Sequence, residues 1–227
     1  MQVVILIYRL TGTPKSITKL YNSYTGTPDF SHLAEHCAHI SPIPTTSYLE
    51  RQRALAQTLH ELNASAYIAE PGASAAYFAN LSSSQWHLSE RPLMLIISPE
   101  LDSHEQVHAK VSILTPAFEA TRAKLLSIPS ESDLTYPSWP EDVNPFEVAV
   151  SAVAQLGEGT IYVDGMMRSF ILEGLQKATT SARVLTAPVE VRRLRERKSA
   201  EELEIMKCAN EVCIFVHIYA PVTSEHM

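Results

Sequence analysis

Histidine is the residue type whose spacing in this sequence first suggests metal or acid–base chemistry. His32, His36 and His39 lie at i, i+4 and i+7, which on an α-helix would place all three on one face. The first and last would then lie about 10.5 Å apart along the axis, at 1.5 Å per residue. Because zinc–nitrogen bonds are near 2.1 Å, one ion could bind only a neighbouring pair. The spacing therefore favours a polar helix face over a zinc site.

A second histidine pair lies in the stretch "DSHEQVH". His104 and His108 have the same i, i+4 spacing, with acidic neighbours and no identifiable third ligand. They fall between two predicted strands, where a solvated loop or a short helix is the usual occupant. We favour this interpretation over metal binding or acid–base work.

The cysteines and glycines add no clear catalytic motif. The chain has three cysteines, an odd number: Cys37, Cys208 and Cys213. They lack metal-ligand spacing, and we predict reduced thiols rather than a disulfide framework. The nucleophile motif G-x-S-x-G is missing, and the glycines at 157, 159 and 165 form neither a P-loop nor a dinucleotide fingerprint. Local sequence motifs therefore do not indicate a particular reaction for this chain.

Charge argues against a nucleic-acid-binding protein. The 227-residue chain has a net charge of -7 and a pI near 5.7, so phosphate attraction would have to be local. The basic stretch "VRRLRERK" is followed at once by acidic residues, and Ser199 with Glu202 has the spacing of a helix-capping box. We predict a connector that turns into a helix, and no nucleic-acid partner.

Apolar runs are too short for a membrane span. "VVILIY", at 3–8, and "IFVHIYA", at 214–220, fall well below the length that crosses a bilayer. We expect no membrane association and a cytoplasmic location.

Hydrophobic patterning predicts an α/β fold. A helix is expected over about 47–62, with Ser47 as its cap and leucines at helical spacing. Short runs rich in β-forming residues predict strands at 66–70, 77–80, 93–98, 111–115, 160–164 and 183–187. Helical patterns lie at about 117–126, 145–156 and 167–178, and a Pro-rich acidic excursion covers 127–145. This alternation predicts a three-layer domain with a mixed sheet of about six strands flanked by helices.

Two stretches together resemble the N-terminal domain of the creatinase, prolidase and Xaa-Pro aminopeptidase group, the "pita-bread" metallopeptidase family. One is residues 48–98, including "YFAN", a Trp-containing loop and the lead "ERP" into a strand. The other is "VRRLRERKSAEELEIMKCANEV", similar to the connector and start of the catalytic domain. With "DGMMRSFILEGL" between them, the resemblance covers about residues 47–212. It implies a creatinase N-terminal-domain-like fold with a ribonuclease H-like motif.

The resemblance also implies where the chemistry of the family resides. Its C-terminal domain holds two divalent metals through two Asp, one His and two Glu, and hydrolyses bonds next to proline or C–N bonds in small amidino compounds. The aspartates here, at 29, 102, 133, 142 and 164, do not give the paired spacing of that family. We therefore expect no cofactor in this chain, with the two metal ions only in a missing catalytic domain, and no enzymatic activity for the chain alone.

These observations predict four segments: an extended leader over 1–45, the creatinase/prolidase-like domain over 46–190, a connector and the start of the catalytic-domain helix over 191–213, and an atypical tail over 214–227. The change of character after Cys213 favours a truncated gene model or transcript over a fragment or a genuine short homologue.

By position, the loop from Tyr77 through Trp86 and Glu90 to Arg91 is the candidate for contact with a substrate or a partner. The alternatives are that the aromatic residues belong to the core or cover the sheet edge. Three functions stay open: a non-catalytic dimerisation or active-site-covering domain of an Xaa-Pro aminopeptidase-like metallopeptidase, a binding module that pairs with a full-length homologue, and a small independent hydrolase. The expected partner is a second copy or a full-length homologue.

The helix expected over 199–213 carries an apolar stripe that includes Leu203, Met206 and Cys213, beside Ile205 and Val212. We expect this stripe to pack back on the α/β domain, to self-associate or to fray.

Overall fold

A computed structural model describes residues 33, 35–153 and 159–219, and these residues belong to two compact units. One unit spans Pro42–Ser199 and contains the whole sheet. The other comprises the described residues up to Ser41 and the helical residues Ala200–Tyr219.

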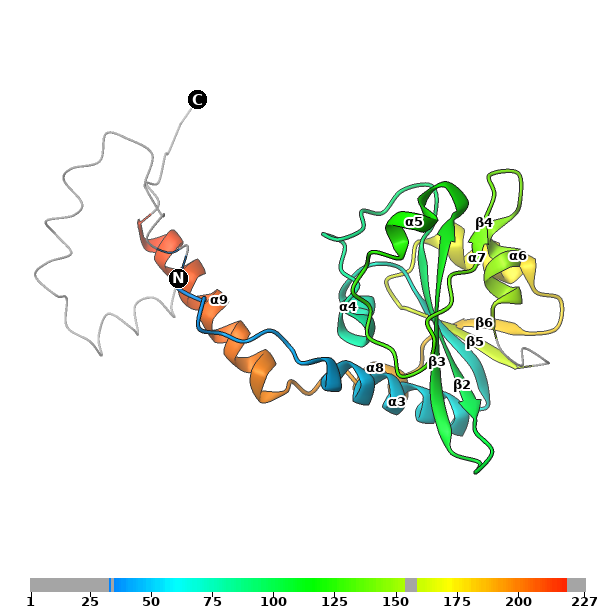
Figure 1. The fold of residues 1–227 in the computed structure, drawn as a ribbon, viewed down its shortest axis with the longest axis horizontal. Helices are drawn as coiled ribbons and strands as arrows, with labels where there is room; N and C mark the ends of the chain where they lie inside the picture. The colour runs from blue at the N-terminus through cyan, green and yellow to red at the C-terminus, as the bar shows by residue number, and fades with distance from the viewer. Residues whose placement is uncertain (1–32, 34, 154–158, 220–227) are drawn as a thin grey trace, which may run out of the picture. The chain divides into compact units, whose positions relative to one another are not determined.

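Helices and strands follow one another along the first unit, and β2 and β3 are consecutive strands (Figure 1). They are α3 (Thr45–Glu61), β1 (Ala64–Ala69), α4 (Ala73–Ala79), β2 (Met94–Leu101), β3 (Val107–Pro116), the 3-10 turn η2 (Ala117–Glu119), α5 (Ala120–Ala123), β4 (Ser138–Trp139), α6 (Pro145–Ser151), β5 (Thr160–Val163), α7 (Ser169–Ala178), β6 (Arg183–Thr186) and α8 (Val189–Arg193).

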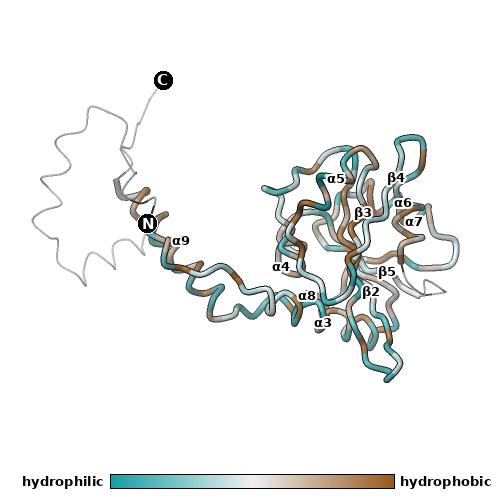
Figure 2. Tube along the Cα trace, in the orientation of Figure 1, coloured by the Kyte–Doolittle hydropathy of each residue, from teal (hydrophilic) through white to brown (hydrophobic). Residues whose placement is uncertain are grey.

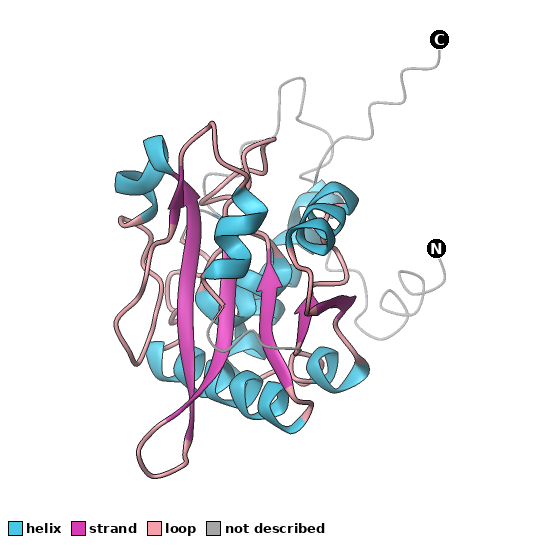
Figure 3. Cartoon of the chain, turned by 90° about the vertical axis from the view of Figure 1, so that its right-hand side faces the viewer, coloured by secondary structure: helices cyan, strands magenta, loops and turns pink. Residues whose placement is uncertain are grey.

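The six strands form one mixed sheet in the order β4-β3-β2-β1-β5-β6. β1 pairs antiparallel with β2, and β2 with β3, whereas β1–β5, β5–β6 and β3–β4 are parallel. Helices α3 and α4 lie against one face of the sheet, and α6 and α7 against the other (Figures 1 and 3). The α/β prediction with about six strands in three layers is confirmed.

Side-chain alternation along the strands explains the three layers. On β2, Leu95 and Ile97 point into the core under α3, and Met94 and Ile96 into the core under α7. Since both faces of the sheet are covered, the central strands read as nearly continuous apolar runs (Figure 2).

One predicted strand is wrong: residues 77–80 belong to the helix α4 and its end. The segment "ASAAYFA" contains four alanines, which have the highest helix propensity, and Asn80 ends the helix at a φ of 54°. Tyr77 and Phe78 therefore do not alternate across a sheet. Phe78 is buried, with its ring edge-on to Tyr67 at 5.7 Å between centroids.

Helix starts and one short strand also differ from the sequence prediction. α3 begins after Pro44 without a side-chain cap, so the predicted cap by Ser47 is wrong; Ser47 lies inside the first turn and its amide bonds to the carbonyl of Pro44. The Pro-rich excursion contains β4, whose two residues pair with the end of β3. Two residues are too few for a periodic signal, and neighbouring strand β3 supplies the partner.

The second unit contains α9 (Ala200–Tyr219) and a turn at 35–39. The turn replaces the helix assumed for the histidine spacing, and His32 lies outside the described residues. Cys37 and Cys208 form a disulfide with 5.9 Å between their Cα atoms, so the prediction of three reduced thiols is wrong. Cys213 alone of the three is free, and it is exposed. The two bonded cysteines are 171 positions apart, which is why no local spacing indicated the bond.

The predicted apolar stripe on α9 lies mostly at the surface. Leu203, Ile205 and Met206 are exposed, whereas Cys208 is buried through its disulfide. The helix continues through Ile214, Phe215 and Val216 and ends at Tyr219.

Several predictions fall on residues 1–32, 154–158 and 220–227, which lie outside the described residues. They concern most of the leader, the run "VVILIY", Gly157 and the end of the tail. Within the described part of the chain, no helix combines the length and the apolar character that a bilayer crossing needs.

Candidate functional site

The loop between α4 and β2 carries three of the predicted contact residues, and its own hydrogen bonds shape it. The Ser82 amide donates to the Gln85 side chain at 2.8 Å, and the Trp86 amide donates to the Ser82 carbonyl at 3.2 Å. These bonds form a tight turn that directs Trp86 inward, where its side chain is only 3% exposed. Trp86 is thus part of the core under α3.

Two arginines frame the outer side of this loop. Arg122 lies 4.2 Å over the Trp86 ring and pairs with Glu119 at 3.0 Å. Arg91 pairs with Glu141 at 2.5 Å, and its guanidinium lies 5.7 Å from the ring of Phe118. All four charged side chains are at least partly exposed, so these ion pairs contribute little to stability. Their main effect is to orient the two guanidinium groups.

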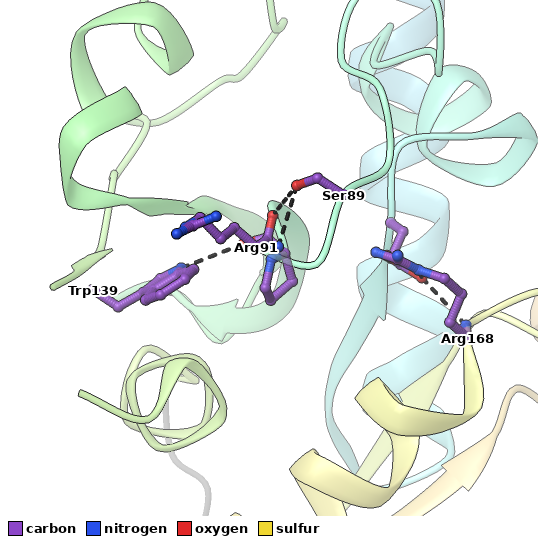
Figure 4. A network of polar contacts seen from close by, with 6 residues as sticks. Ser89, Arg91, Trp139 and Arg168 are labelled. Atoms are coloured by element: carbon purple, nitrogen blue, oxygen red, sulfur yellow. Dashed lines mark hydrogen bonds and ion pairs between the residues drawn. The ribbon is translucent and has the colours of Figure 1, made fainter. Parts of the chain in front are cut away.

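The backbone around Arg91 is held from two sides (Figure 4). The Ser89 hydroxyl accepts from the Arg91 amide at 3.2 Å and donates to the Arg91 carbonyl at 2.9 Å. The Trp139 indole donates to the Pro92 carbonyl at 3.3 Å, which ties β4 to the residues that lead into β2. These hydrogen bonds therefore fix the backbone from which the Arg91 side chain extends.

Two adjoining surface depressions meet at Arg91 and Phe118, with volumes of about 560 and 380 Å³. Phe118, at 62% exposure, is a large apolar side chain presented to solvent between them. Their linings, besides Arg91 and Phe118, are Ala117, Pro140 and Glu141 for the first and Trp86, His87, Leu88, Ser89, Pro116, Glu119 and Arg122 for the second. We call Arg91, Phe118, Glu119, Arg122 and Glu141 the Phe118 surface.

The four predicted contact residues therefore have different positions. Arg91 lines both depressions and the buried Trp86 lines the second, whereas Tyr77 and Glu90 line neither depression. The Tyr77 hydroxyl donates to the Leu194 carbonyl at 2.6 Å, and Arg51 lies 4.1 Å over its ring. Tyr77 thus joins α4 to the end of α8. Sequence reasoning missed Phe118 in η2, Arg122 in α5 and Glu141 just after β4, all of which are distant in sequence from Arg91.

A second polar cluster lies where the parallel strands β1 and β5 end. Glu70 is 7% exposed and binds Arg168 through 2.5 and 3.0 Å hydrogen bonds, and it also accepts from the Arg168 amide at the start of α7 (Figure 4). The Ser74 hydroxyl donates to Asp164 at 3.0 Å. Burial, with the charge of Asp164 next, raises the pKa of the Tyr67 phenol well above its usual range. Because Glu70 is ion-paired with Arg168 and Asp164 accepts a hydrogen bond from Ser74, the cluster links the β1–α4 connection to the β5–α7 connection.

The pair His104 and His108 lies at the β2–β3 hairpin, whose turn is shaped by Asp102. Asp102 accepts from the amides of His104 at 2.7 Å and Gln106 at 2.9 Å, and its other oxygen lies 3.1 Å from His108 Nε2. The hydrogen bond from Gln106, followed by those from His104 and His108, lowers the pKa of the Asp102 carboxyl. The solvated-loop interpretation accounts for His104, whereas His108 lies on β3.

Comparison with known proteins gives relatives in both sequence and structure. No family model matches the chain. It is 33% identical over 198 residues to an uncharacterized peptidase of Schizosaccharomyces pombe, a match covering 87% of this chain and 42% of that protein. The chain therefore spans about two fifths of the length of this curated relative.

Two solved structures share the fold. The dipeptidase PepE of Mycobacterium ulcerans superposes with a TM-score of 0.62 at 19% identity, and a prolidase of Thermococcus sibiricus with 0.59 at 15% identity. Each match covers 78% of this chain and 44% of the other. The resemblance seen in the sequence is thus confirmed: the α/β unit has the fold of the creatinase and prolidase N-terminal domain, and the chain is related in sequence to a fission-yeast peptidase.

Proposed function

We propose that this chain provides the non-catalytic N-terminal domain of an Xaa-Pro aminopeptidase-like peptidase, and that its Phe118 surface contacts a second peptidase subunit. The observation that carries the proposal is the fold, together with the sequence relationship to a peptidase more than twice as long. The subunit is either another copy of this chain or a full-length homologue.

The positions of the acidic residues support a non-catalytic role. The resemblance implies a dinuclear site of two Asp, one His and two Glu, in which metals activate a water and polarise the scissile carbonyl. In the described part of the chain, Asp102 serves the hairpin turn and Asp164 accepts from Ser74. The group of described residues with metal-ligand geometry is His36, Cys208 and Glu211, which contains no aspartate. We therefore expect the two metal ions to bind only in the catalytic part of such a peptidase.

The composition of the Phe118 surface supports a protein partner. Aromatic residues and arginine are enriched in the centres of protein interfaces, because they combine apolar contact area with directed hydrogen bonds. Phe118 supplies the apolar centre, and Arg91 and Arg122 lie on either side with acidic partners of their own. Such alternating charges can exchange their partners for those of an opposing subunit.

Sedimentation velocity of the purified chain tests the contact. We expect the chain to self-associate, or to form a mixed complex when co-expressed with a full-length homologue. Phe118→Ser should weaken the association at least about tenfold, which corresponds to about 1.4 kcal/mol. Met166→Ser is the matched control, because Met166 is also apolar and 83% exposed but lines neither depression. A strictly monomeric chain in both settings, or equal effects of the two substitutions, would contradict the proposed contact.

A peptidase assay tests the non-catalytic role separately. The purified chain, incubated with Mn²⁺ and an Xaa-Pro dipeptide, should release no amino acid above the rate of a heat-denatured sample. Metal-dependent release of the residue before proline by the chain alone would instead establish the independent hydrolase considered from the sequence.

A further inference from the structure

The disulfide of the second unit lies beside two further metal-ligating side chains. His36 Nε2 is 2.9 Å from Glu211 Oε2, directly next to the Cys37–Cys208 bond. The ligand atoms of His36, Cys208 and Glu211 all lie within 4.8 Å of one another. Two sulfurs, one imidazole and one carboxylate thus meet at one point, although they come from positions 36–37 and 208–211 of the chain.

Local structure fixes the direction of all four side chains. Cys208 and Glu211 are three residues apart on α9 and therefore share one face of the helix. Phe215, one turn further, packs edge-on against the His36 ring, with 5.8 Å between centroids. The turn that carries His36 and Cys37 is closed by the bonds His36 N to Leu33 O and Ala38 N to Glu35 O. The imidazole is therefore held against the helix face that carries Glu211.

We propose that the thiol form of this cluster is a zinc site formed by Cys37, Cys208, His36 and Glu211, and that the disulfide is its metal-free oxidised form. Zinc takes four ligands from cysteine sulfur, histidine nitrogen and carboxylate oxygen in closed tetrahedral sites. Cys208 is 4% exposed, which shields one side of the site, whereas His36 and Glu211 are partly open to solvent and leave a path for entry.

The conversion is a balanced two-electron reduction followed by proton displacement. Two equivalents of a small monothiol (RSH) break the S–S bond by exchange, giving two cysteine thiols and RSSR. Zn²⁺ then replaces the two thiol protons, which pass to solvent, while neutral His36 and ionised Glu211 complete the coordination. Tetrahedral geometry at Zn–S bonds of about 2.3 Å requires the two sulfurs to separate to about 3.8 Å. Side-chain rotation alone can provide this with the Cα atoms 5.9 Å apart.

Zinc titration of the full chain in two redox states tests the site. The chain is reduced with a monothiol, freed of it by gel filtration under argon, and titrated in competition with a chromophoric chelator. We expect one zinc per chain in the thiol form and none in the disulfide form. Co²⁺ in place of Zn²⁺ should give the near-ultraviolet thiolate-to-metal charge-transfer band, which reports sulfur ligation directly.

Variants assign the ligands. Cys208→Ser should abolish stoichiometric binding, and His36→Ala should weaken it at least about tenfold, the scale at which even outer partners of metal sites act. Cys213→Ser is the matched control, since this free, exposed cysteine lies outside the cluster, and it should leave binding unchanged. Tryptophan fluorescence of Trp86 and Trp139 checks that each variant keeps the folded α/β unit.

Three results would each overturn the proposal: no zinc uptake by the reduced wild-type chain, equal uptake by the oxidised chain, or a cobalt spectrum without sulfur ligation. Because this titration uses neither peptidase activity nor subunit association, its outcome is independent of the proposed function.

Discussion

Gly174 gives the sharpest test of how the helices on one face of the sheet pack. It lies inside α7, where a methyl group added at its Cα would stand 2.3 Å from Cδ2 and Cε2 of the Phe146 ring and 2.6 Å from Cζ. Van der Waals contact between carbons needs about 3.5 Å or more, so the Phe146 ring would have to move. The glycine is thus required by the approach of α6 to α7, and not by backbone conformation.

Two opposing terms set the magnitude for Gly174→Ala. Alanine in a helix interior gains about 1 kcal/mol over glycine, whereas overpacking costs about 1–3 kcal/mol. We expect a net destabilisation of about 1 kcal/mol. In a Phe146→Ala background the clash is gone, so the same substitution should stabilise the protein by about 1 kcal/mol. The predicted coupling between the two sites is therefore about 2 kcal/mol.

Urea unfolding of the wild type, both single variants and the double variant measures this cycle. Trp139 provides the fluorescence signal, since it is buried in the same core against which Phe146 packs. Unchanged m-values would show that the substitutions alter the free energy of unfolding without altering the surface that unfolding exposes. If Gly174→Ala has the same sign and size in both backgrounds, with coupling below about 0.5 kcal/mol, the steric argument is wrong.

Three further predictions concern side-chain pairs. Glu70→Gln should lower the free energy of unfolding in urea by about 2 kcal/mol, because it leaves the partly buried Arg168 charge without a carboxylate. The control Glu173→Gln breaks an exposed pair with Lys177 and should lower it by about 0.5 kcal/mol or less; equal losses would contradict the role of burial. The lowered pKa of Asp102 means that its contribution is present above the unfolded value of about 3.9 and is lost as pH falls through the folded pKa. The protection of the hairpin-turn amides, measured relative to the intrinsic exchange rate at each pH, should therefore fall only below about pH 4, and a fall at higher pH would count against the turn bonds. Maleimide labelling of the denatured chain, read by mass spectrometry, should modify one cysteine before reduction and three after it; three before reduction would refute the disulfide.

Local periodicity was enough to predict most of the fold. Five of the six predicted strands coincide with β1, β2, β3, β5 and β6. These strands are buried on both sheet faces, so each appears in the sequence as a short continuous run of apolar, β-forming residues. The leucines at helical spacing likewise predicted α3 over nearly its full length. The error at 77–80 arose because aromatic residues favour strands in general, whereas the alanines around Tyr77 and Phe78 form α4 here.

The sequence by itself therefore determined the α/β architecture and the resemblance to creatinase and prolidase N-terminal domains, since both depend on local patterns. Only the tertiary structure brought Arg91 to Glu141, Glu70 to Arg168, and Cys37 to Cys208, pairs separated by 50, 98 and 171 positions. Such contacts depend on strand order and on the path of long connections, which periodicity does not encode. For the same reason, the histidine spacing that first suggested a metal site involved the wrong neighbours: His36 meets its partners Cys208 and Glu211 through the fold, and not along a helix of its own.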